Sequence, residues 1–299
     1  MQKAQSSPVL EKYYRMVTPE SLERLVDFRQ RYPYQTRAVH EQTWTYIDSD
    51  PSGKMTSTPV VILAGGTGIA EVSFQSIDHF AQQQRVIAPD YPAMSSLKEL
   101  FIGLIALLDQ LGVREFNLMG GSYGGWIVQS LVRVQPTRVH KVVMTAISPP
   151  NPENSRQLAR LLPWLRLLPT FVFKAMLNRT FSRLDTTQTS AYPDMALLWG
   201  LVKEVLDTRV QRRDLFALME RLIDQTEQYT FQPDDLKDWP GSILMVFGSE
   251  DPASPAEKRE AMRQLYPQAE MVVFEGGQHG IALTHQQEYF AAIDRFLNN

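Results

Sequence analysis

Cysteine is absent from the 299 residues of this sequence. Its absence excludes disulfide bonds, thiol nucleophiles and thiolate metal sites. Disulfides belong to oxidising compartments, so a chain without them suits a reducing cytosol, and we expect a cytoplasmic location. Residues 1–14 are polar and charged, and they therefore lack the apolar stretch of a secretory signal peptide.

A surplus of charge of either sign is also missing. The 30 basic and 33 acidic residues leave a net charge of −3, which gives no reason to expect a nucleic-acid partner. No uninterrupted apolar run reaches the roughly 18 residues that a membrane span requires. The longest candidate, 161–177, is interrupted by prolines and charged residues, so we expect no stable insertion into a membrane.

Strand and helix signals alternate along most of the chain. Short apolar runs rich in β-branched residues predict buried strands at 59–64, 85–89, 115–119, 141–146, 242–247 and 271–274. Apolar residues at helical spacing predict helices at 72–83, 96–111, 125–134, 255–265 and 286–297. A further strand is predicted at 43–47 and a helix at 19–29. This alternation is typical of the α/β class, with a mostly parallel sheet covered by helices on both faces.

The alternation is interrupted once. It stops at Ser148-Pro149-Pro150 and resumes at Ser242, and the interval between them shows helical periodicity with little strand signal. Residues 1–148 and 241–299 are therefore predicted to form the α/β core. Residues 149–240 are predicted to be a helical cap, or lid, inserted between two core strands.

The segment 120–125 contains the pattern G-x-S-x-G between a predicted strand and a predicted helix. A nucleophile on such a sharp turn takes strained backbone angles, and small neighbours at Gly120 and Gly124 let the chain pass without a clash. A glycine-rich turn with an incidental serine is the alternative interpretation. The position between strand and helix favours Ser122 as a nucleophile exposed above the sheet edge.

A serine hydroxyl needs a base at neutral pH, and His279 is the best placed of the five histidines. It follows the last predicted strand, at the end where an open α/β sheet builds its binding site. His79 and His140 are better explained as structural residues, and His285 as a surface or capping residue.

The acid that orients the imidazole is predicted to be Asp251, which follows the strand at 242–247. Its neighbour Glu250 is one alternative, and an Asp-Pro turn without catalytic function is the other. The chain order Ser122, Asp251, His279 favours Asp251, because α/β-hydrolases have this order and the other serine-protease folds do not.

Two backbone N–H groups are expected to stabilise an oxyanion. One belongs to Tyr123, directly after the nucleophile. The other belongs to Gly66 in the loop after the strand at 59–64, with Thr67 as the alternative donor. Glycine lets a backbone approach a substrate closely, although a plain glycine turn is the other interpretation of this loop.

Taken together, the glycine loop, the G-x-S-x-G turn, the late aspartate and the late histidine resemble the α/β-hydrolase superfamily over nearly the whole chain. Within it, the sequence is similar to the maspardin-like branch. Three stretches carry this similarity: Phe28-Arg29-Gln30, Arg85-Val86-Ile87-Ala88 with Tyr91-Pro92, and Leu265-Tyr266-Pro267-Gln268-Ala269. The resemblance implies the α/β-hydrolase fold for the core.

Two departures from the family patterns matter. Many superfamily members carry His-Gly after the third strand, whereas this chain has Ala64-Gly65, so the side-chain support of the glycine loop differs. Maspardin-type proteins are associated with protein binding and an incomplete triad. This chain has all three residues in place, which argues for a working enzyme.

An apolar stretch at 161–173 in the predicted cap has two interpretations. It roofs a hydrophobic pocket for an acyl or alkyl group, or it forms the cap's own core. A surplus of basic residues between Glu153 and Arg183 indicates a solvated helix face, or a contact with an anionic substrate, a lipid surface or a partner. The candidate pocket residues are Thr67, Trp126, Trp164, Phe171 and Trp199.

The sequence therefore predicts a serine hydrolase that cleaves carboxylic esters with small or hydrophobic groups through an acyl-enzyme on Ser122. Its partner is a small-molecule ester, and the chemistry requires no metal or organic cofactor. Thioester, amide or carbon–carbon bond hydrolysis by the same triad stays open, as does a non-enzymatic, maspardin-like protein-binding role. Lipid-interface binding through the cap is a third alternative, and the oligomeric state is left open.

Overall fold

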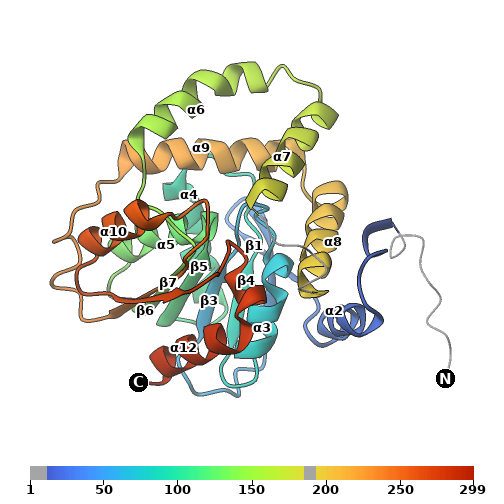
Figure 1. Ribbon diagram of the computed structural model, residues 1–299. Helices are drawn as coiled ribbons and strands as arrows, with labels where there is room; N and C mark the ends of the chain where they lie inside the picture. Colours follow the sequence, from blue (N-terminus) through green and yellow to red (C-terminus); the bar gives the residue numbers. More distant parts are fainter. Residues whose placement is uncertain (1–11, 185–192) are drawn as a thin grey trace, which may run out of the picture.

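The computed structural model describes residues 12–184 and 193–299. Within them, eight strands form one sheet in the order β1-β2-β4-β3-β5-β6-β7-β8 (Figure 1). β1 pairs antiparallel with β2, and β2 with β4, whereas the remaining pairs are parallel. The predicted α/β class with a mostly parallel sheet is confirmed. The strands are β1 (Gln35–Val39), β2 (Gln42–Asp48), β3 (Val60–Leu63), β4 (Val86–Pro89), β5 (Phe116–Gly121), β6 (Val139–Thr145), β7 (Ser242–Gly248) and β8 (Glu270–Phe274).

Both faces of the sheet are buried, which explains the unbroken apolar runs in its strands. Along β3, Val61 and Leu63 join one hydrophobic core, while Val60 and Ile62 join the other. Helices α4, α5 and α10 contribute to the first core, and α2, α3 and α12 to the second. Their bounds, with two short helical turns, are α2 (Pro19–Arg31), η1 (Ala70–Ser73), α3 (Phe74–Phe80), α4 (Leu97–Gln110), α5 (Tyr123–Val134), α10 (Ala256–Leu265), α11 (Ile281–Thr284) and α12 (Gln286–Asn298).

Between β6 and β7, the regular elements of the described residues are all helices, joined by loops. These helices are α6 (Pro152–Leu165), α7 (Thr170–Leu184), α8 (Pro193–Thr208) and α9 (Arg212–Gln228). In Figure 1, α6, α7 and α9 lie above the sheet, and α8 descends beside it next to α2. They form the segment that we propose as the cap. Among the described helices, none is long and apolar enough to cross a bilayer.

Three elements differ from the sequence predictions. The sequence patterns do not predict β1, because only Val39 of this strand is buried and no apolar alternation marks it. The helix predicted at 72–83 is a short 3₁₀ turn, η1, followed by α3, which ends at Phe80. The helix predicted from Gly125 begins two positions earlier, so α5 starts directly after Ser122.

A buried ion pair joins β2 to the start of β4. Arg85 Nη2 lies 2.6 Å from Asp48 Oδ2, and Arg85 Nε lies 3.0 Å from Asp48 Oδ1. Arg85 Nη1 also donates to the Leu111 carbonyl at 3.1 Å, and the Asp48 side chain is fully buried. This bidentate ion pair fixes the antiparallel edge of the sheet to its parallel part.

We expect Asp48→Ala to lower the free energy of unfolding by about 3–5 kcal/mol, because it leaves the Arg85 guanidinium buried without its partner. Chemical denaturation measures the loss. The matched control is Asp109→Ala, which removes a 2.8 Å ion pair to Arg138 from a carboxylate that is 56% exposed. The control should change stability by less than about 1 kcal/mol, and equal losses in the two variants would contradict the assignment.

Candidate active site

Ser122 lies at the turn between β5 and α5 with φ 53° and ψ −123°, a strained conformation for a residue with a side chain. A Cβ on Gly120 would lie 2.6 Å from the Gly124 backbone, and a Cβ on Gly124 would collide with the Leu63 carbonyl of β3. The Ser122 N–H donates to the Thr145 carbonyl at 2.9 Å, which ties the turn to β6. Close backbone packing therefore requires both glycines of G-x-S-x-G.

Asp251 and His279 come from the loops after β7 and β8, and the structure brings them together. Both carboxylate oxygens of Asp251 lie 3.0 Å from Nδ1 of His279. Asp251 is 1% exposed, and it also accepts hydrogen bonds from the Ser254 hydroxyl at 2.6 Å and the Ala253 N–H at 2.8 Å. With Nδ1–H donating to this carboxylate, Nε2 of His279 is the nitrogen available as a base.

The surroundings of Asp251 keep its carboxyl ionised. Burial alone raises the pKa of a carboxyl group. Hydrogen bonds from His279, Ser254 and Ala253, with the charge of His279, outweigh burial and hold the pKa of Asp251 below its ordinary value. An ionised Asp251 stabilises the imidazolium that forms when His279 accepts a proton.

Glu250, the alternative acid, contacts a different partner. Its carboxylate accepts a hydrogen bond from Gln278 Nε2 at 2.9 Å, while both carboxylate oxygens of Asp251 lie on the imidazole. Of the two neighbouring carboxylates, Asp251 is therefore the one positioned to orient His279.

The loops after β7 and β8 are held against each other through their backbones. The Ser249 N–H donates to the Phe274 carbonyl and the Glu250 N–H to the Gly277 carbonyl, each at 2.9 Å. A Cβ on Gly248 would collide with the Gly277 carbonyl. The absence of a side chain at Gly248 thus allows the two loops to meet, and their meeting sets the position of the acid and the imidazole.

Two cavities meet at Ser122 and His279, which line both of them. The larger has a volume of about 720 Å³ and opens toward α6, α9 and α10. The smaller, of about 200 Å³, lies against α8 and the loop after β3. Among the residues that the structure describes, the Ser122 hydroxyl has no hydrogen-bond partner, His279 included. In unliganded sites such bonds commonly tighten only when substrate is present.

The predicted oxyanion donors lie beside Ser122, the predicted nucleophile. Gly66 and Thr67 border the smaller cavity, next to Ser122, and we name residues 65–68 the candidate oxyanion loop. The Tyr123 N–H belongs to the first turn of α5, where helical N–H groups have no internal acceptor. The Tyr123 hydroxyl is buried and accepts a hydrogen bond from Arg221 Nε at 2.8 Å, which ties α9 to the nucleophile turn.

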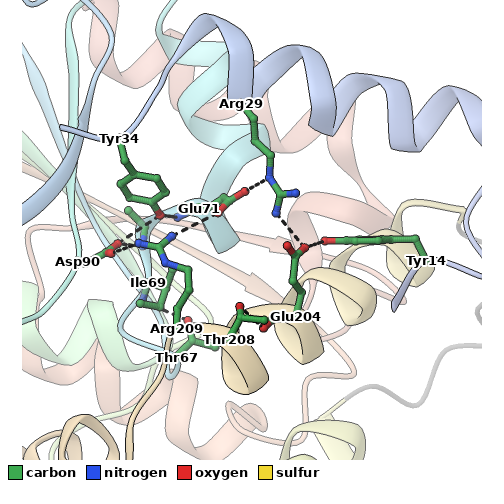
Figure 2. Close-up of polar contacts among 11 residues, drawn as sticks. Tyr14, Arg29, Tyr34, Thr67, Ile69, Glu71, Asp90, Glu204, Thr208 and Arg209 are labelled. Atoms are coloured by element: carbon green, nitrogen blue, oxygen red, sulfur yellow. Dashed lines mark hydrogen bonds and ion pairs between the residues drawn. The ribbon is translucent and has the colours of Figure 1, made fainter. Parts of the chain in front are cut away.

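A polar network holds the segment that follows the candidate oxyanion loop (Figure 2). Asp90, directly after β4, accepts a hydrogen bond from the Ala70 N–H at 2.8 Å. Arg209, directly after α8, donates to Asp90 at 2.6 Å and lies 3.4 Å from Glu71. The Tyr34 hydroxyl accepts from the Glu71 N–H at 3.1 Å. The proposed cap is thereby bonded to the segment that continues the loop.

The same network reaches the N-terminal helix. Arg29 of α2 bonds Glu71 and also lies with Nη2 2.9 Å from a carboxylate oxygen of Glu204 on α8, as Figure 2 shows. The Tyr14 hydroxyl donates to the same carboxylate of Glu204. Sequence reasoning missed this network, and its one signal was the stretch Phe28-Arg29-Gln30, which includes Arg29.

Three of the predicted pocket residues line the cavities. Trp126 lines the larger cavity, and Thr67 and Trp199 line the smaller one. The smaller cavity also contains apolar side chains that sequence reasoning did not single out, namely Val72, Met195, Leu198 and Val202. Most of them come from α8, so this helix forms the apolar wall of the smaller cavity.

The prediction that Trp164 and Phe171 line the pocket is corrected by the structure. They are 70% and 76% exposed, and neither lines the two cavities at Ser122. The inward positions of α6 and α7 are taken by Leu162 and Phe173, which are 8% and 1% exposed. Helix geometry then turns the neighbouring aromatic residues outward.

Three of the other four histidines, His79, His140 and His285, lie away from Ser122. His79 and His140 each place Nε2 against a carboxylate, at 2.8 and 2.9 Å. His285 directly precedes α12, and its ring stacks on Phe274. Neither cavity beside the nucleophile includes any of the three.

Both the sequence and the fold are similar to known proteins. The sequence profile described as "Alpha/beta hydrolase family" matches residues 60–293. Maspardin of Danio rerio is 28% identical over 235 residues, covering 76% of this chain and 70% of maspardin. An esterase from Thermogutta terrifontis has a TM-score of 0.70 at 17% identity, covering 89% of this chain and 98% of the esterase. An enol-lactonase from Burkholderia xenovorans LB400 has a TM-score of 0.70 at 15% identity, covering 89% and 100%.

The Asp90 carboxyl makes stability depend on pH. Burial raises the pKa of Asp90 to about 6, although Arg209 and two hydrogen bonds act against burial. An unfolded chain has an Asp pKa of about 3.9, so between about pH 4 and 6 the folded state binds more protons than the unfolded state. Stability contributed by this group is therefore full below about pH 4 and decreases as pH rises to about 6.

Asp90→Asn keeps the size of the side chain but removes its titration, so this decrease of stability with pH should disappear. The expected size, for a shift of about two pKa units, is about 3 kcal/mol between the two ends of the window. Denaturation curves of both proteins from about pH 4 to pH 7 measure the difference. Asp251 cancels in the difference because both proteins contain it. Parallel stability profiles would contradict the prediction.

Proposed function

This chain belongs to the alpha/beta hydrolase family, and from that premise we propose that it is a serine hydrolase that cleaves carboxylic esters through an acyl-enzyme on Ser122. The resemblance to the maspardin-like branch, drawn from short stretches of sequence, is confirmed by the match to maspardin. The fold of the family indicates hydrolase activity. The choice of esters, the acyl-enzyme and the roles of the residues below are our proposal.

One observation carries the proposal. A buried carboxylate contacts Nδ1 of His279 through both oxygens at 3.0 Å, and the same histidine lines both cavities with Ser122. In the first step, Nε2 of His279 accepts the proton of the Ser122 hydroxyl as its oxygen attacks the ester carbonyl. His279 then gives this proton to the alcohol, which leaves as the carbon–oxygen bond breaks. Water attacks the acyl-enzyme with His279 again as the base and restores the free serine.

The tetrahedral intermediate carries a negative charge on its oxygen. In this proposal the oxygen lies beside one N–H group at the start of α5 and one N–H group of the candidate oxyanion loop. We assign the N–H groups of Tyr123 and Gly66 as donors to this oxygen, with Thr67 as the alternative to Gly66. A single such donor is worth about 3 kcal/mol of transition-state stabilisation. The departure at Ala64-Gly65 leaves these backbone donors intact. The network of Asp90, Arg209 and Glu71 supplies support close to this loop.

The two cavities divide an ester between them in this proposal. The candidate oxyanion loop borders the smaller cavity, so we place the acyl chain there, against Trp199 and its apolar neighbours on α8. The alcohol portion lies in the larger cavity, whose walls include polar residues of α6, α9 and α10. A volume of 200 Å³ holds about seven groups the size of a water molecule, which corresponds to a short acyl chain.

Thioester and amide hydrolysis use the same residues, so a substrate panel decides among these reactions. The esterase and the enol-lactonase share the fold at identities of 17% and 15%, and their likeness supports the fold alone. A non-enzymatic, protein-binding role like that of maspardin-type proteins is the other alternative. It differs by predicting an unreactive Ser122.

Labelling with a fluorophosphonate probe, followed by mass mapping, tests whether Ser122 is an activated nucleophile. We expect an adduct on Ser122 that is lost in Ser122→Ala and His279→Ala. Asp251→Asn should slow the reaction by roughly 10⁴-fold, because the imidazole loses its orienting charge and the correct tautomer. The matched control is Ser148→Ala, which changes another serine of the larger cavity and should keep the adduct. Well-folded wild type without an adduct would favour the binding-protein alternative.

Acyl selectivity tests the use of the smaller cavity. With p-nitrophenyl esters of increasing acyl length, kcat/KM should fall beyond about six carbons, because a longer chain exceeds the space against α8. Trp199→Ala should move this limit to longer chains. Leu158→Ala, which enlarges the larger cavity, is the control and should leave the limit of acyl chain length unchanged. A shift in the control and none in Trp199→Ala would reverse the placement of the acyl and alcohol portions.

A further inference from the structure

Four large apolar side chains are exposed at the corner where α6 leads into α7. Leu161 is 56% exposed, Trp164 70%, and Leu167 and Phe171 are both 76% exposed. All four lie between residues 161 and 171, whereas exposed apolar residues such as Ile102 on α4 and Val273 on β8 lie far from them in sequence. We name these four residues the apolar patch. A cluster of this kind on a protein surface usually marks an interaction site.

The helices at this corner pack through other apolar side chains, so their packing does not require the residues of the apolar patch. The inward side of the corner has its own core, in which Phe173 is 1% exposed and stacks on Phe216 at 5.0 Å between ring centroids. Leu162 is 8% exposed on the same inward side. The end of α6 is therefore apolar on two faces, and only one of them is satisfied within the described chain.

The corner is also held in place. The guanidinium of Arg212 on α9 donates to the carbonyl groups of Leu165, Arg166 and Leu168, at the end of α6 and in the turn that follows it. The Leu167 N–H donates to the Trp164 carbonyl at 3.0 Å, so the turn itself is tight. These bonds present the apolar patch as a defined surface. Figure 1 shows this corner at the outer edge of the molecule, on the side away from α12.

The charges around the apolar patch decide which partner fits it. Basic side chains outnumber acidic ones there, although the chain as a whole has a net charge of −3. Glu153 pairs with Arg156 and Glu220 pairs with Arg166, while Lys174 donates to the Leu206 carbonyl on α8. Arg160, which is exposed, has no carboxylate partner among the described residues. A second copy of this chain would bring the same positive charge against it. An anionic surface with an apolar interior complements both features.

We propose that the apolar patch docks this protein on the surface of an anionic phospholipid bilayer. Trp164 and Phe171 enter the boundary between head groups and acyl chains, and Leu161 and Leu167 extend the buried area. Arg160 contacts lipid phosphates. The attachment is peripheral, through one helix corner, and it is independent of the chemistry at Ser122.

Docking by this corner has a consequence for the cavities. The first half of α6 lines the larger cavity through Asn154, Ser155 and Leu158, and the other end of the same helix carries the apolar patch. A bilayer that holds the α6–α7 corner therefore contacts the C-terminal end of the helix whose first half borders the larger cavity.

Flotation with vesicles tests the proposal. Wild type should bind vesicles of phosphatidylcholine with phosphatidylglycerol and should bind pure phosphatidylcholine vesicles much more weakly. The double variant Trp164→Ser with Phe171→Ser should lose about tenfold or more in partition coefficient. Ile102→Ser, an equal change of polarity at a 52% exposed position on α4, is the matched control and should bind as wild type does. Thermal melting of each protein verifies that the variants are folded.

Two further variants separate the contributions. Arg160→Glu should weaken binding to the anionic vesicles by about tenfold, with the loss reduced at high salt. Brominated lipids should quench the tryptophan fluorescence of wild type more strongly than that of Trp164→Phe. This variant retains an apolar ring and therefore still binds. Absence of wild-type binding to anionic vesicles would overturn the proposal. So would equal binding by wild type and the double variant. A concentration-dependent dimer that the double variant abolishes would assign the apolar patch to a second copy of the chain.

Discussion

The arrangement at Ser122 depends on backbone segments that approach one another closely at glycine residues along one edge of the sheet. α5 begins directly after Ser122 because Gly124 presents no Cβ to the Leu63 carbonyl of β3. On the other side, Gly248 lies against Gly277, and the loops after β7 and β8 meet there. Interiors packed at this density leave no space for even one added methyl group. The positions of Ser122, the His279 imidazole and the Asp251 carboxylate therefore follow from the same steric constraint.

Buried charge connects the parts of the molecule that surround this edge. Glu71 is bonded by Arg29 of α2 and lies 3.4 Å from Arg209, while Arg209 also bonds Asp90 after β4. Removing one partner from such a network strands a buried charge, so the network acts as a unit. The N-terminal helix, the proposed cap and the segment after the candidate oxyanion loop thus share the same carboxylates. A movement of α8 would displace both the apolar wall of the smaller cavity and the side chains beside the candidate oxyanion loop.

The proposed cap has two different surfaces. Its inner side supplies Trp199 to the smaller cavity and Leu158 to the larger one. Its outer corner exposes Trp164 and Phe171 among basic residues. The apolar stretch at 161–173 therefore combines the cap's own core with an exposed surface, and it does not roof a pocket. The identity of an apolar residue in a helix does not show which side of the molecule it faces. That depends on where the partners of the helix lie.

Features that depend on neighbours along the chain could be predicted from the order of the amino acids. Strands buried on both faces require continuous apolar runs, and a turn from strand to helix at a serine requires glycines two positions away on either side. The mostly parallel sheet and the glycine turn at Ser122 could be predicted on these grounds, and the chain order Ser122, Asp251, His279 favoured Asp251 over Glu250 without deciding between them. The edge strand β1 could not, because a strand with one buried residue leaves no periodic pattern.

Which distant side chains meet became clear from the three-dimensional structure. It distinguished Asp251 from Glu250 through the crossing of two loops, turned Trp199 inward and Trp164 outward, and joined Arg209 to Asp90 across 119 positions. Periodicity and local sterics act over a few residues, whereas ion pairs and cavity walls are formed by elements far apart in sequence. Their contacts exist only after the whole chain has packed.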